Sequence, residues 1–174
     1  FRASIVARAR FIEDLVVDQA GRGVTQYVIL GAGLDSFGQR RPEIASRIRI
    51  FEIDQPGPQA WKRQRRIALG FGVPDWLHFV PVDFERERLP EELARAGFRP
   101  DRRAVFSCLG VVPYLGDEAI AAMLRFVASC VRETTIVFDY STPPDELPPR
   151  QKARFDVIAA RAASAGEPWL TFFE

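Results

Sequence analysis

The stretch Tyr27-Val-Ile-Leu-Gly-Ala-Gly-Leu-Asp-Ser36 decides the fold, because it places a glycine turn directly after a short apolar run. A second apolar run, residues 48–53, is followed at once by Asp54. In open α/β sheets, a strand, a glycine turn and a carboxylate at the tip of the next strand hold the adenosine part of a cofactor. We therefore expect residues 27–30 and 48–53 to be neighbouring strands beside a nucleoside site.

Apolar runs and helical patterns alternate along the whole chain. Further strands are expected at residues 78–82, 104–109 and 134–138. Helices are expected at residues 2–19, 60–69, 90–96, 117–131 and 150–165, with a short helix or turn at 36–47 and a proline-rich loop at 141–149. The strands are continuous apolar runs, which indicates a mostly parallel sheet covered by helices on both faces. At 174 residues the chain is about one domain long, so we expect a single Rossmann-like α/β domain over residues 1–174.

Composition excludes several classes of protein. The formal net charge of +1 argues against a nucleic-acid-binding surface. No apolar run approaches the roughly 18 residues of a spanning helix, and the arginine-studded N-terminal segment does not resemble a signal peptide. We therefore expect a cytoplasmic protein that does not act at a membrane, with Cys108 and Cys130 as reduced thiols. Because the first residue is Phe1 and residues 169–174 resemble the opening of another element, we also expect a fragment of a longer polypeptide.

The residues after the second glycine indicate which cofactor is bound. A dinucleotide site needs a third glycine three residues after Gly33, where the helix must approach the pyrophosphate and offer free N–H groups. This chain has Ser36 there, preceded by Asp35. A carboxylate repels a pyrophosphate but accepts hydrogen bonds from an amino-acid ammonium. S-adenosylmethionine carries an ammonium and no phosphate, so it is favoured over NAD(P). The alternative for Asp35 is a turn or cap residue that bonds its own backbone, and for the glycines a tight turn that needs their φ values.

Other candidate residues follow the remaining strands. Asp54 is placed to accept both ribose hydroxyls, with a helix-capping role before Pro56 as the alternative. Asp83 could accept from the adenine amino group while Phe84 packs near the ring, and a solvated loop aspartate is the alternative. The segment 109–114 follows a strand at the edge where open sheets bind ligands, or else packs a helix entry.

Two further features are interpreted as structural. His78 is expected at the amino-terminal edge of its strand, as a surface or capping residue and not a catalytic base. The cations Lys62, Arg63, Arg65 and Arg66 are interpreted as the solvated face of a helix. The sequence has no Ser-His-Asp arrangement and no metal-ligand spacing, so no metal is expected.

Three strings together resemble the leucine carboxyl methyltransferase family, particularly its bacterial S-adenosylmethionine-dependent branch: residues 28–36, Phe51-Glu-Ile-Asp-Gln-Pro56 and Gly110-Val-Val-Pro-Tyr-Leu115. The resemblance spans nearly the whole chain. It implies a class I methyltransferase fold with S-adenosyl-L-methionine lying across the carboxyl ends of the strands. The cofactor-binding positions that it implies are Arg8, Gly31, Ala32, Gly33, Asp35, Asp54, Gln55, Asp83, Phe84, Leu109 and Gly110.

Within that set, the resemblance implies distinct roles. Gly31 and Gly33 would line the methionine part, and an arginine before the first strand would bind the cofactor carboxylate. Arg8 fits that position best, with Arg10 next. Leu109 stands where eukaryotic members have a glutamate, so one polar contact is missing or supplied elsewhere. Family members also extend further at both ends.

The expected reaction is methyl transfer to an oxygen of a small-molecule acceptor, with a protein C-terminal carboxylate less favoured. Orientation alone can supply about 7–11 kcal/mol of such a barrier, and the sequence offers no convincing base, so a carboxylate is preferred over a hydroxyl acceptor. Tyr114 and Tyr140 are the candidate substrate-binding residues, and residues 141–165 a candidate acceptor lid. The alternatives are a nicotinamide-dependent oxidoreductase, which a missing Tyr-x-x-x-Lys arrangement disfavours, and a degenerate homologue without turnover.

Overall fold

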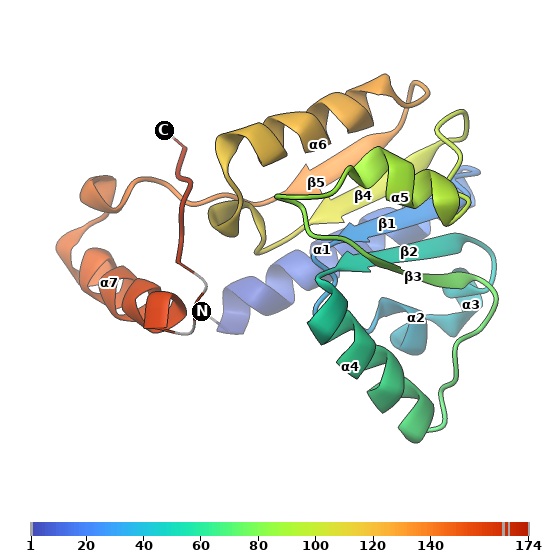
Figure 1. The fold of residues 1–174 in the computed structure, drawn as a ribbon, viewed down its shortest axis with the longest axis horizontal. Helices are drawn as coiled ribbons and strands as arrows, with labels where there is room; N and C mark the ends of the chain where they lie inside the picture. The colour runs from blue at the N-terminus through green and yellow to red at the C-terminus, as the bar shows by residue number, and fades with distance from the viewer. Residues whose placement is uncertain (1, 165, 167, 174) are drawn as a thin grey trace.

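The structure is built on a five-stranded parallel sheet with the strand order β3-β2-β1-β4-β5. The computed structural model of the protein describes residues 2–164, 166 and 168–173. The strands are β1 (Gln26–Leu30), β2 (Arg49–Asp54), β3 (Leu77–Pro81), β4 (Ala104–Cys108) and β5 (Thr135–Phe138). Each neighbouring pair runs parallel, which confirms the expected open, parallel α/β fold (Figure 1).

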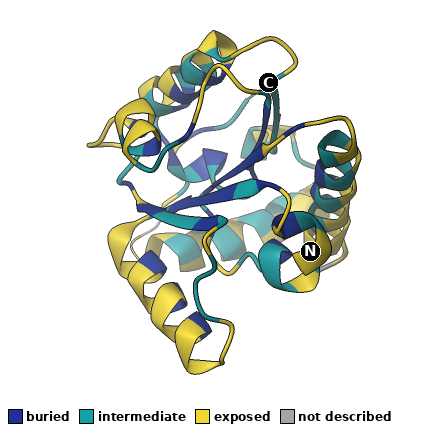
Figure 2. Ribbon diagram, turned by 90° about the vertical axis from the view of Figure 1, so that its right-hand side faces the viewer, coloured by how far each residue is buried: buried dark blue, intermediate teal, exposed yellow. Residues whose placement is uncertain are grey.

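Helices cover both faces of this sheet. They are α1 (Arg2–Gly21), α2 (Phe37–Arg40), α3 (Pro42–Ala45), α4 (Pro56–Ala68), α5 (Leu89–Arg95), α6 (Asp117–Ser129) and α7 (Pro149–Ser164), with short 3-10 helices η1 (Val112–Tyr114) and η2 (Pro144–Glu146). In β1, Val28 and Leu30 belong to the core under α5 and α6, whereas Tyr27 and Ile29 belong to the core under α1, α2 and α3. The inner strands β1 and β4 are buried on both faces, the edge strands β3 and β5 are only partly buried, and the outer helix faces are exposed (Figure 2).

The C-terminal part lies beside the sheet rather than on it. Helix α7 has no buried residue and is set apart from the strands (Figure 1). The segment after it returns to η1, where the backbone N–H of Leu170 donates to Pro113 O at 2.6 Å and the Thr171 hydroxyl donates to Leu115 O at 2.6 Å. This return places residues 168–173 next to the carboxyl edge of the sheet.

The short helix or turn expected at residues 36–47 is confirmed as two short helices. Other local predictions were wrong: helix α4 begins at Pro56 rather than residue 60, and the expected loop at 141–149 contains η2. His78 lies inside β3, where it stacks on Phe51 with 4.9 Å between ring centroids. Its Nε2 accepts from Arg49 Nε at 3.3 Å, so His78 is a half-buried partner of Arg49 on the neighbouring strand β2 and does not cap the strand.

Candidate functional site

Two cavities meet at the carboxyl edge of the sheet, on either side of Gly31. The helix-side cavity, of about 400 Å³, lies between α1 and the ends of β1 and β4; the strand-tip cavity, of about 540 Å³, lies at the ends of β2 and β3 and beside η1. The connections from β1 and β4 leave in opposite directions here, which is where open α/β sheets bind ligands. The helix-side cavity is lined by the predicted residues Arg8, Gly31, Ala32, Gly33, Asp35 and Leu109. The strand-tip cavity is lined by Gly31, Asp54, Gln55, Asp83, Phe84, Gly110 and Tyr114.

The backbone leaves β1 in a conformation that residues with a side chain rarely adopt, and this is why the turn contains glycine. Gly31 has φ of +67° and Gly33 has φ of +44°, both in the left-handed region. A Cβ on Gly31 would also lie 2.2 Å from Val111 Cγ2. Gly31 is thus required by the turn itself and by the close packing of Val111 against it, and it lines both cavities.

Asp54 closes this turn from the tip of β2. Its Oδ2 accepts from the Gly33 N–H at 2.5 Å and its Oδ1 accepts from the Gln55 N–H at 2.7 Å. The same carboxylate lines the strand-tip cavity. Asp54 therefore fixes the glycine turn and does not cap α4, whose N-cap is Gln55 without a side-chain bond, and its carboxylate also lines the cavity.

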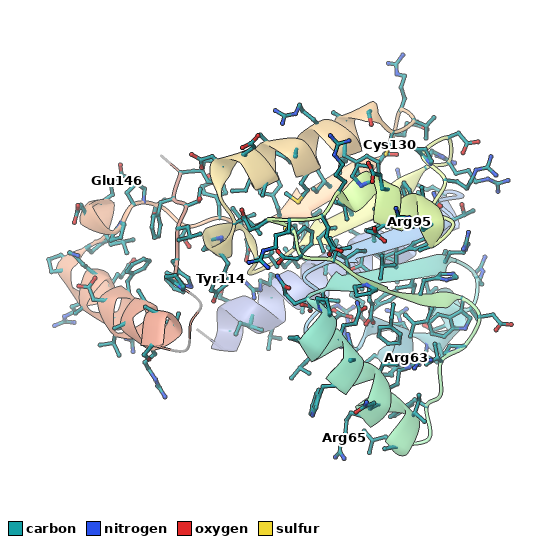
Figure 3. All side chains as sticks on the ribbon, viewed as in Figure 1. Arg63, Arg65, Arg95, Tyr114, Cys130 and Glu146 are labelled. Atoms are coloured by element: carbon teal, nitrogen blue, oxygen red, sulfur yellow. The ribbon has the colours of Figure 1, made fainter. Side chains whose placement is uncertain are left out.

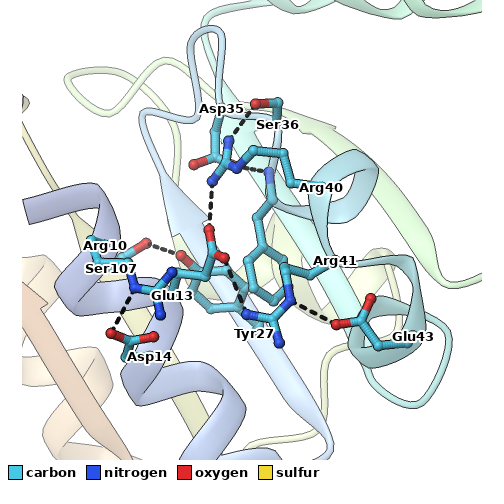
Figure 4. Close-up of polar contacts among 11 residues, drawn as sticks. Arg10, Glu13, Asp14, Tyr27, Asp35, Ser36, Arg40, Arg41, Glu43 and Ser107 are labelled. Carbon is cyan, nitrogen blue, oxygen red and sulfur yellow. Dashed lines mark hydrogen bonds and ion pairs between the residues drawn. The ribbon is translucent and has the colours of Figure 1, made fainter. Parts of the chain in front are cut away.

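Asp35 caps the helix that follows the turn. Its Oδ1 accepts from the backbone N–H of Phe37 at 2.7 Å, at the first residue of α2 (Figure 4). Helix α2 spans only four residues, so its dipole is small. Its first backbone N–H is already satisfied by the Asp35 carboxylate. The capping alternative for Asp35 is therefore realised, while its side chain still lines the helix-side cavity.

An ion-pair network fastens α1 to this helix (Figure 4). Glu13 on α1 pairs with Arg40 at 2.9 Å and with Arg41 at 3.1 Å. Burial acts to raise the pKa of Glu13, but the hydrogen bonds from the two guanidinium groups outweigh it and the net pKa is lowered. Glu13 therefore stays ionised and holds Arg40, which lines the helix-side cavity, in a fixed orientation.

The floor of the helix-side cavity carries two hydroxyls that the sequence did not single out. Tyr27 on β1 and Ser107 on β4 lie 3.0 Å apart at their oxygens (Figure 4). Burial, together with the charge of Asp35, raises the pKa of Tyr27. Tyr27 is consequently a neutral hydrogen-bonding group at this floor and not a base. Only the pairing of two strands that are distant in sequence brings these hydroxyls together.

Arg8 reaches the site from α1 and forms an ion pair with Asp139, at the end of β5. Asp139 Oδ1 also accepts from the Gly110 N–H at 2.5 Å. Gly110 has φ of +73°, and a Cβ there would lie 2.7 Å from Arg8 Nη2. Arg10 instead pairs with Asp14 on the exposed side of α1, at 2.8 Å. The structure thus brings Arg8 to the cavity, and it reveals Asp139 as a residue that sequence reasoning missed although it follows a strand as Asp54 and Asp83 do.

The two tyrosines have different surroundings. Tyr114 in η1 lines the strand-tip cavity and lies next to Trp169 of the returning C-terminal segment, with 6.3 Å between ring centroids (Figure 3). Tyr140 lines neither cavity. It is 55% exposed and packs against Phe173, with 5.8 Å between ring centroids. The structure therefore groups Tyr114 with the site and leaves Tyr140 outside it.

The basic cluster on α4 is not uniformly solvated, which corrects the sequence interpretation. Lys62 is buried and its Nζ lies 2.6 Å from Glu52 Oε2, on the inner face of β2. Arg66 is buried too and donates to Gly72 O at 2.8 Å. Only Arg63 and Arg65 are exposed (Figure 3). The cluster is half core and half surface, and none of it lines either cavity.

The parallel sheet, its strand order and the glycine turn beside strand-tip carboxylates define a Rossmann-like fold of the class I methyltransferase type. The chain belongs to the leucine carboxyl methyltransferase family, whose sequence profile matches residues 1–128.

Individual relatives agree with this membership. A Bacillus subtilis (strain 168) protein named "Putative S-adenosyl-L-methionine-dependent methyltransferase YktD" is 34% identical over 169 residues, which are 97% of this chain and 55% of that protein. A similarly named Mycolicibacterium smegmatis (strain ATCC 700084 / mc(2)155) protein is 32% identical over 169 residues, 97% of this chain and 53% of that protein. The chain thus spans about half the length of these curated relatives.

Solved structures share the fold. A DUF574 family protein from Streptomyces avermitilis MA-4680 superposes with a TM-score of 0.69 at 15% identity, covering 96% of this chain and 65% of that one. A protein described as a "putative methyltransferase" from Thermobifida fusca YX gives a TM-score of 0.63 at 18% identity, covering 98% and 61%. At these identities the likeness shows the fold alone. Among the helices of the described residues, none is long and apolar enough to cross a bilayer.

Proposed function

We propose that this chain forms the donor-binding part of an S-adenosylmethionine-dependent methyltransferase that transfers the methyl group to an oxygen. The observation that carries the proposal is the Asp35 carboxylate on the first N–H of α2, at 2.7 Å. A diphosphate would need that N–H free and would be repelled by the charge. A phosphate-free, zwitterionic nucleoside has neither conflict. The names of the Bacillus and Mycolicibacterium relatives support the same donor.

The two cavities match the two halves of such a donor. The strand-tip cavity offers Asp54 for the ribose hydroxyls and Asp83 with Phe84 for the adenine ring. The helix-side cavity offers the guanidinium of Arg8 for the amino-acid carboxylate. The donor would cross between them over Gly31, the residue that lines both.

When bound, the donor supplies a methyl group on a sulfonium for in-line displacement. The residues of this chain would act by binding and orientation, which can lower such a barrier by about 7–11 kcal/mol. The chain's one histidine lies in β3 against Phe51, away from both cavities, and Tyr27 stays protonated. Because no histidine lines either cavity and the carboxylates that do already accept backbone N–H groups, an acceptor that is already a carboxylate fits best. Product analysis that finds only nitrogen methylation would contradict this.

The acceptor side is proposed to be the surface around α7. A cavity of about 740 Å³ lies there, lined by Ser141, Leu147, Phe155, Ile158 and Trp169 among others. Trp169 lines this cavity and packs against Tyr114, which lines the strand-tip cavity. Its largely apolar lining, with Arg154 at its margin, fits a small molecule that has an apolar body and a carboxylate.

Calorimetry with S-adenosylhomocysteine and with NAD tests the donor class. We expect S-adenosylhomocysteine to bind and NAD not to bind. Asp54→Ala should weaken S-adenosylhomocysteine strongly, by about tenfold to a hundredfold, because two ribose hydroxyls lose a charged acceptor. Asp75→Ala, which removes an exposed carboxylate before β3, is the matched control and should leave the affinity unchanged.

The possible outcomes separate the three candidate functions. Binding of NAD in preference to S-adenosylhomocysteine would favour the oxidoreductase alternative, and binding of neither would favour a degenerate homologue. Unchanged affinity in folded Asp54→Ala would refute the ribose assignment.

A further inference from the structure

The Arg8–Asp139 ion pair lies where the two cavities meet. Arg8 lines the helix-side cavity, and Gly110, whose N–H donates to Asp139, lines the strand-tip cavity. We propose that Asp139 is a positioning residue that orients Arg8 and the Gly110 peptide for the amino-acid end of the methyl donor. This inference rests on the proposed function and assigns it a residue outside the set suggested by the sequence.

Asp139 is held rigidly enough for this role. Its N–H donates to Cys108 O at 3.4 Å, which continues the pairing of β5 with β4 by one residue. Its carboxylate then bonds Gly110 with one oxygen and Arg8 with the other. The positive φ of Gly110, +73°, and the 2.7 Å from its ideal Cβ position to Arg8 Nη2 show that the guanidinium lies directly over this peptide. One carboxylate thus joins α1 to the ends of β4 and β5.

Arg8 would be poorly oriented without this partner. An arginine side chain carries about 2 kcal/mol of rotamer entropy, and the Arg8 side chain is still 35% exposed. Pre-ordering a binding group raises affinity because that entropy is not lost on association. The other arginine of the helix-side cavity, Arg40, is held in the same way by Glu13 at 2.9 Å. Each cationic group of this cavity is therefore fixed by a carboxylate from a different element.

Asp139 need not leave when a donor arrives. The observed pair uses Nη1 of Arg8, and a guanidinium has five N–H donors, so a second carboxylate can bind the same group. The donor's amino-acid end has no net charge, and neither has the Arg8–Asp139 pair. Its carboxylate would face Arg8, and its ammonium would lie in the field of Asp139.

Two ligands isolate this role. S-adenosylhomocysteine contains the amino-acid end, whereas 5′-methylthioadenosine contains only the adenosine end. Asp139→Asn keeps the size of the side chain and an oxygen that can accept from Gly110, but it loses the charge that holds Arg8. We expect its affinity for S-adenosylhomocysteine to fall about tenfold and its affinity for 5′-methylthioadenosine to stay within about twofold. Asp14→Asn, which removes the exposed partner of Arg10 on the same helix, should change neither affinity.

A merely structural role for Asp139 predicts a different pattern. Equal loss of both ligands, or unchanged binding of S-adenosylhomocysteine, would overturn the proposal. Asp139→Glu restores the charge and should recover most of the S-adenosylhomocysteine affinity. It provides a second measurement if the Asn variant is unstable. If folded Asp139→Glu binds S-adenosylhomocysteine no better than Asp139→Asn, that result also contradicts the role. If the wild-type protein binds neither nucleoside, the proposed function itself fails and this inference fails with it.

Discussion

At the scale of single residues, three carboxylates follow three strands and each accepts backbone N–H groups. Asp54 accepts from Gly33 and Gln55, Asp139 accepts from Gly110, and Asp83 accepts from Glu85 at 3.1 Å. Bonds of this kind fix the turns at the ends of the strands. The same groups that shape the edge of the sheet are therefore the acceptors available to a ligand.

His78 gives a residue-scale prediction, since it is the only histidine of the chain. Burial lowers its pKa from the ordinary 6.5, and the adjacent charge of Arg49 lowers it further. We expect its NMR titration midpoint to lie below 6.5. Because the unfolded chain then binds this proton more readily than the folded chain, the free energy of unfolding should decrease as the pH falls below 6.5.

A pair of arginine variants tests the cause of this shift. Arg49→Gln removes the like charge and should move the His78 midpoint upward. Arg47→Gln alters an exposed arginine at the same edge of the sheet and should leave the midpoint unchanged. A wild-type midpoint at or above 6.5 would show that His78 is solvated and that its packing on Phe51 is not as described.

The site residues differ in how far the sequence alone could find them. Gly31 and Asp54 are recognisable because the turn and the strand tip are local features with a fixed spacing. Arg8 was selected through the family resemblance, because nothing in its local helix distinguishes it from Arg10. Asp139 was missed because its role depends on an α1 side chain 131 residues away. Pairing between distant elements leaves no local pattern.

At the scale of elements, α4 is fixed to β2 by a buried ion pair. Lys62 and Glu52 are 9% and 4% exposed, and the side-chain amide of Gln59 donates to Glu52 O at 2.7 Å. Burial raises the pKa of Glu52 even though Lys62 opposes the shift. The attraction within the pair therefore does not fully offset the desolvation of the carboxylate.

Lys62→Met should be strongly destabilising, because it leaves the Glu52 carboxylate buried without its partner. We expect a loss of about 3–5 kcal/mol in the free energy of unfolding at pH 7, measured by urea denaturation. The pKa of Glu52 should rise further in this variant. A raised carboxyl pKa costs stability at pH values above it, so the loss should become smaller as the pH is lowered toward 5.

Two further variants complete this test. Arg63→Met changes the neighbouring exposed residue and should alter stability by less than about 0.5 kcal/mol. The double variant Glu52→Leu with Lys62→Met removes both charges and should recover most of the loss. If Lys62→Met is no more destabilising than Arg63→Met, the pair is solvated and α4 is held by other contacts.

The order of the elements was largely predictable, because each strand is a continuous apolar run bounded by glycine, proline or charged residues. Which side chains of each helix face the sheet was less predictable. Lys62 and Arg66 are charged residues in a cationic stretch, and such residues are rarely fully buried unless paired. Their partners, Glu52 on β2 and the Gly72 carbonyl beyond α4, become visible only once the helix is packed on the sheet.

At the scale of the whole molecule, the two edges of the sheet differ in chemistry. The carboxyl edge holds both cavities and the three strand-tip carboxylates. The amino edge holds a hollow of about 380 Å³ whose lining includes Arg47, Arg49, Arg99 and Arg102. The position of the first strand between β2 and β4 explains why a ligand is expected at one edge only, since only there do two connections diverge.

Amide hydrogen exchange can map this asymmetry. With S-adenosylhomocysteine at about a hundred times its Kd, core amides that exchange through global unfolding should gain up to about 2.7 kcal/mol of protection. Loop amides that exchange through local fluctuations should slow only where the ligand contacts them, at residues 31–36, 54–55 and 109–114. Loop amides of the amino edge, at residues 46–48 and 99–102, should keep their rates because nothing binds there. Slowing confined to the amino edge would place the nucleoside in the arginine-lined hollow, and the donor could then not cross between the two cavities over Gly31. Slowing at residues 31–36 without slowing at residues 109–114 would remove Gly110 from the donor site.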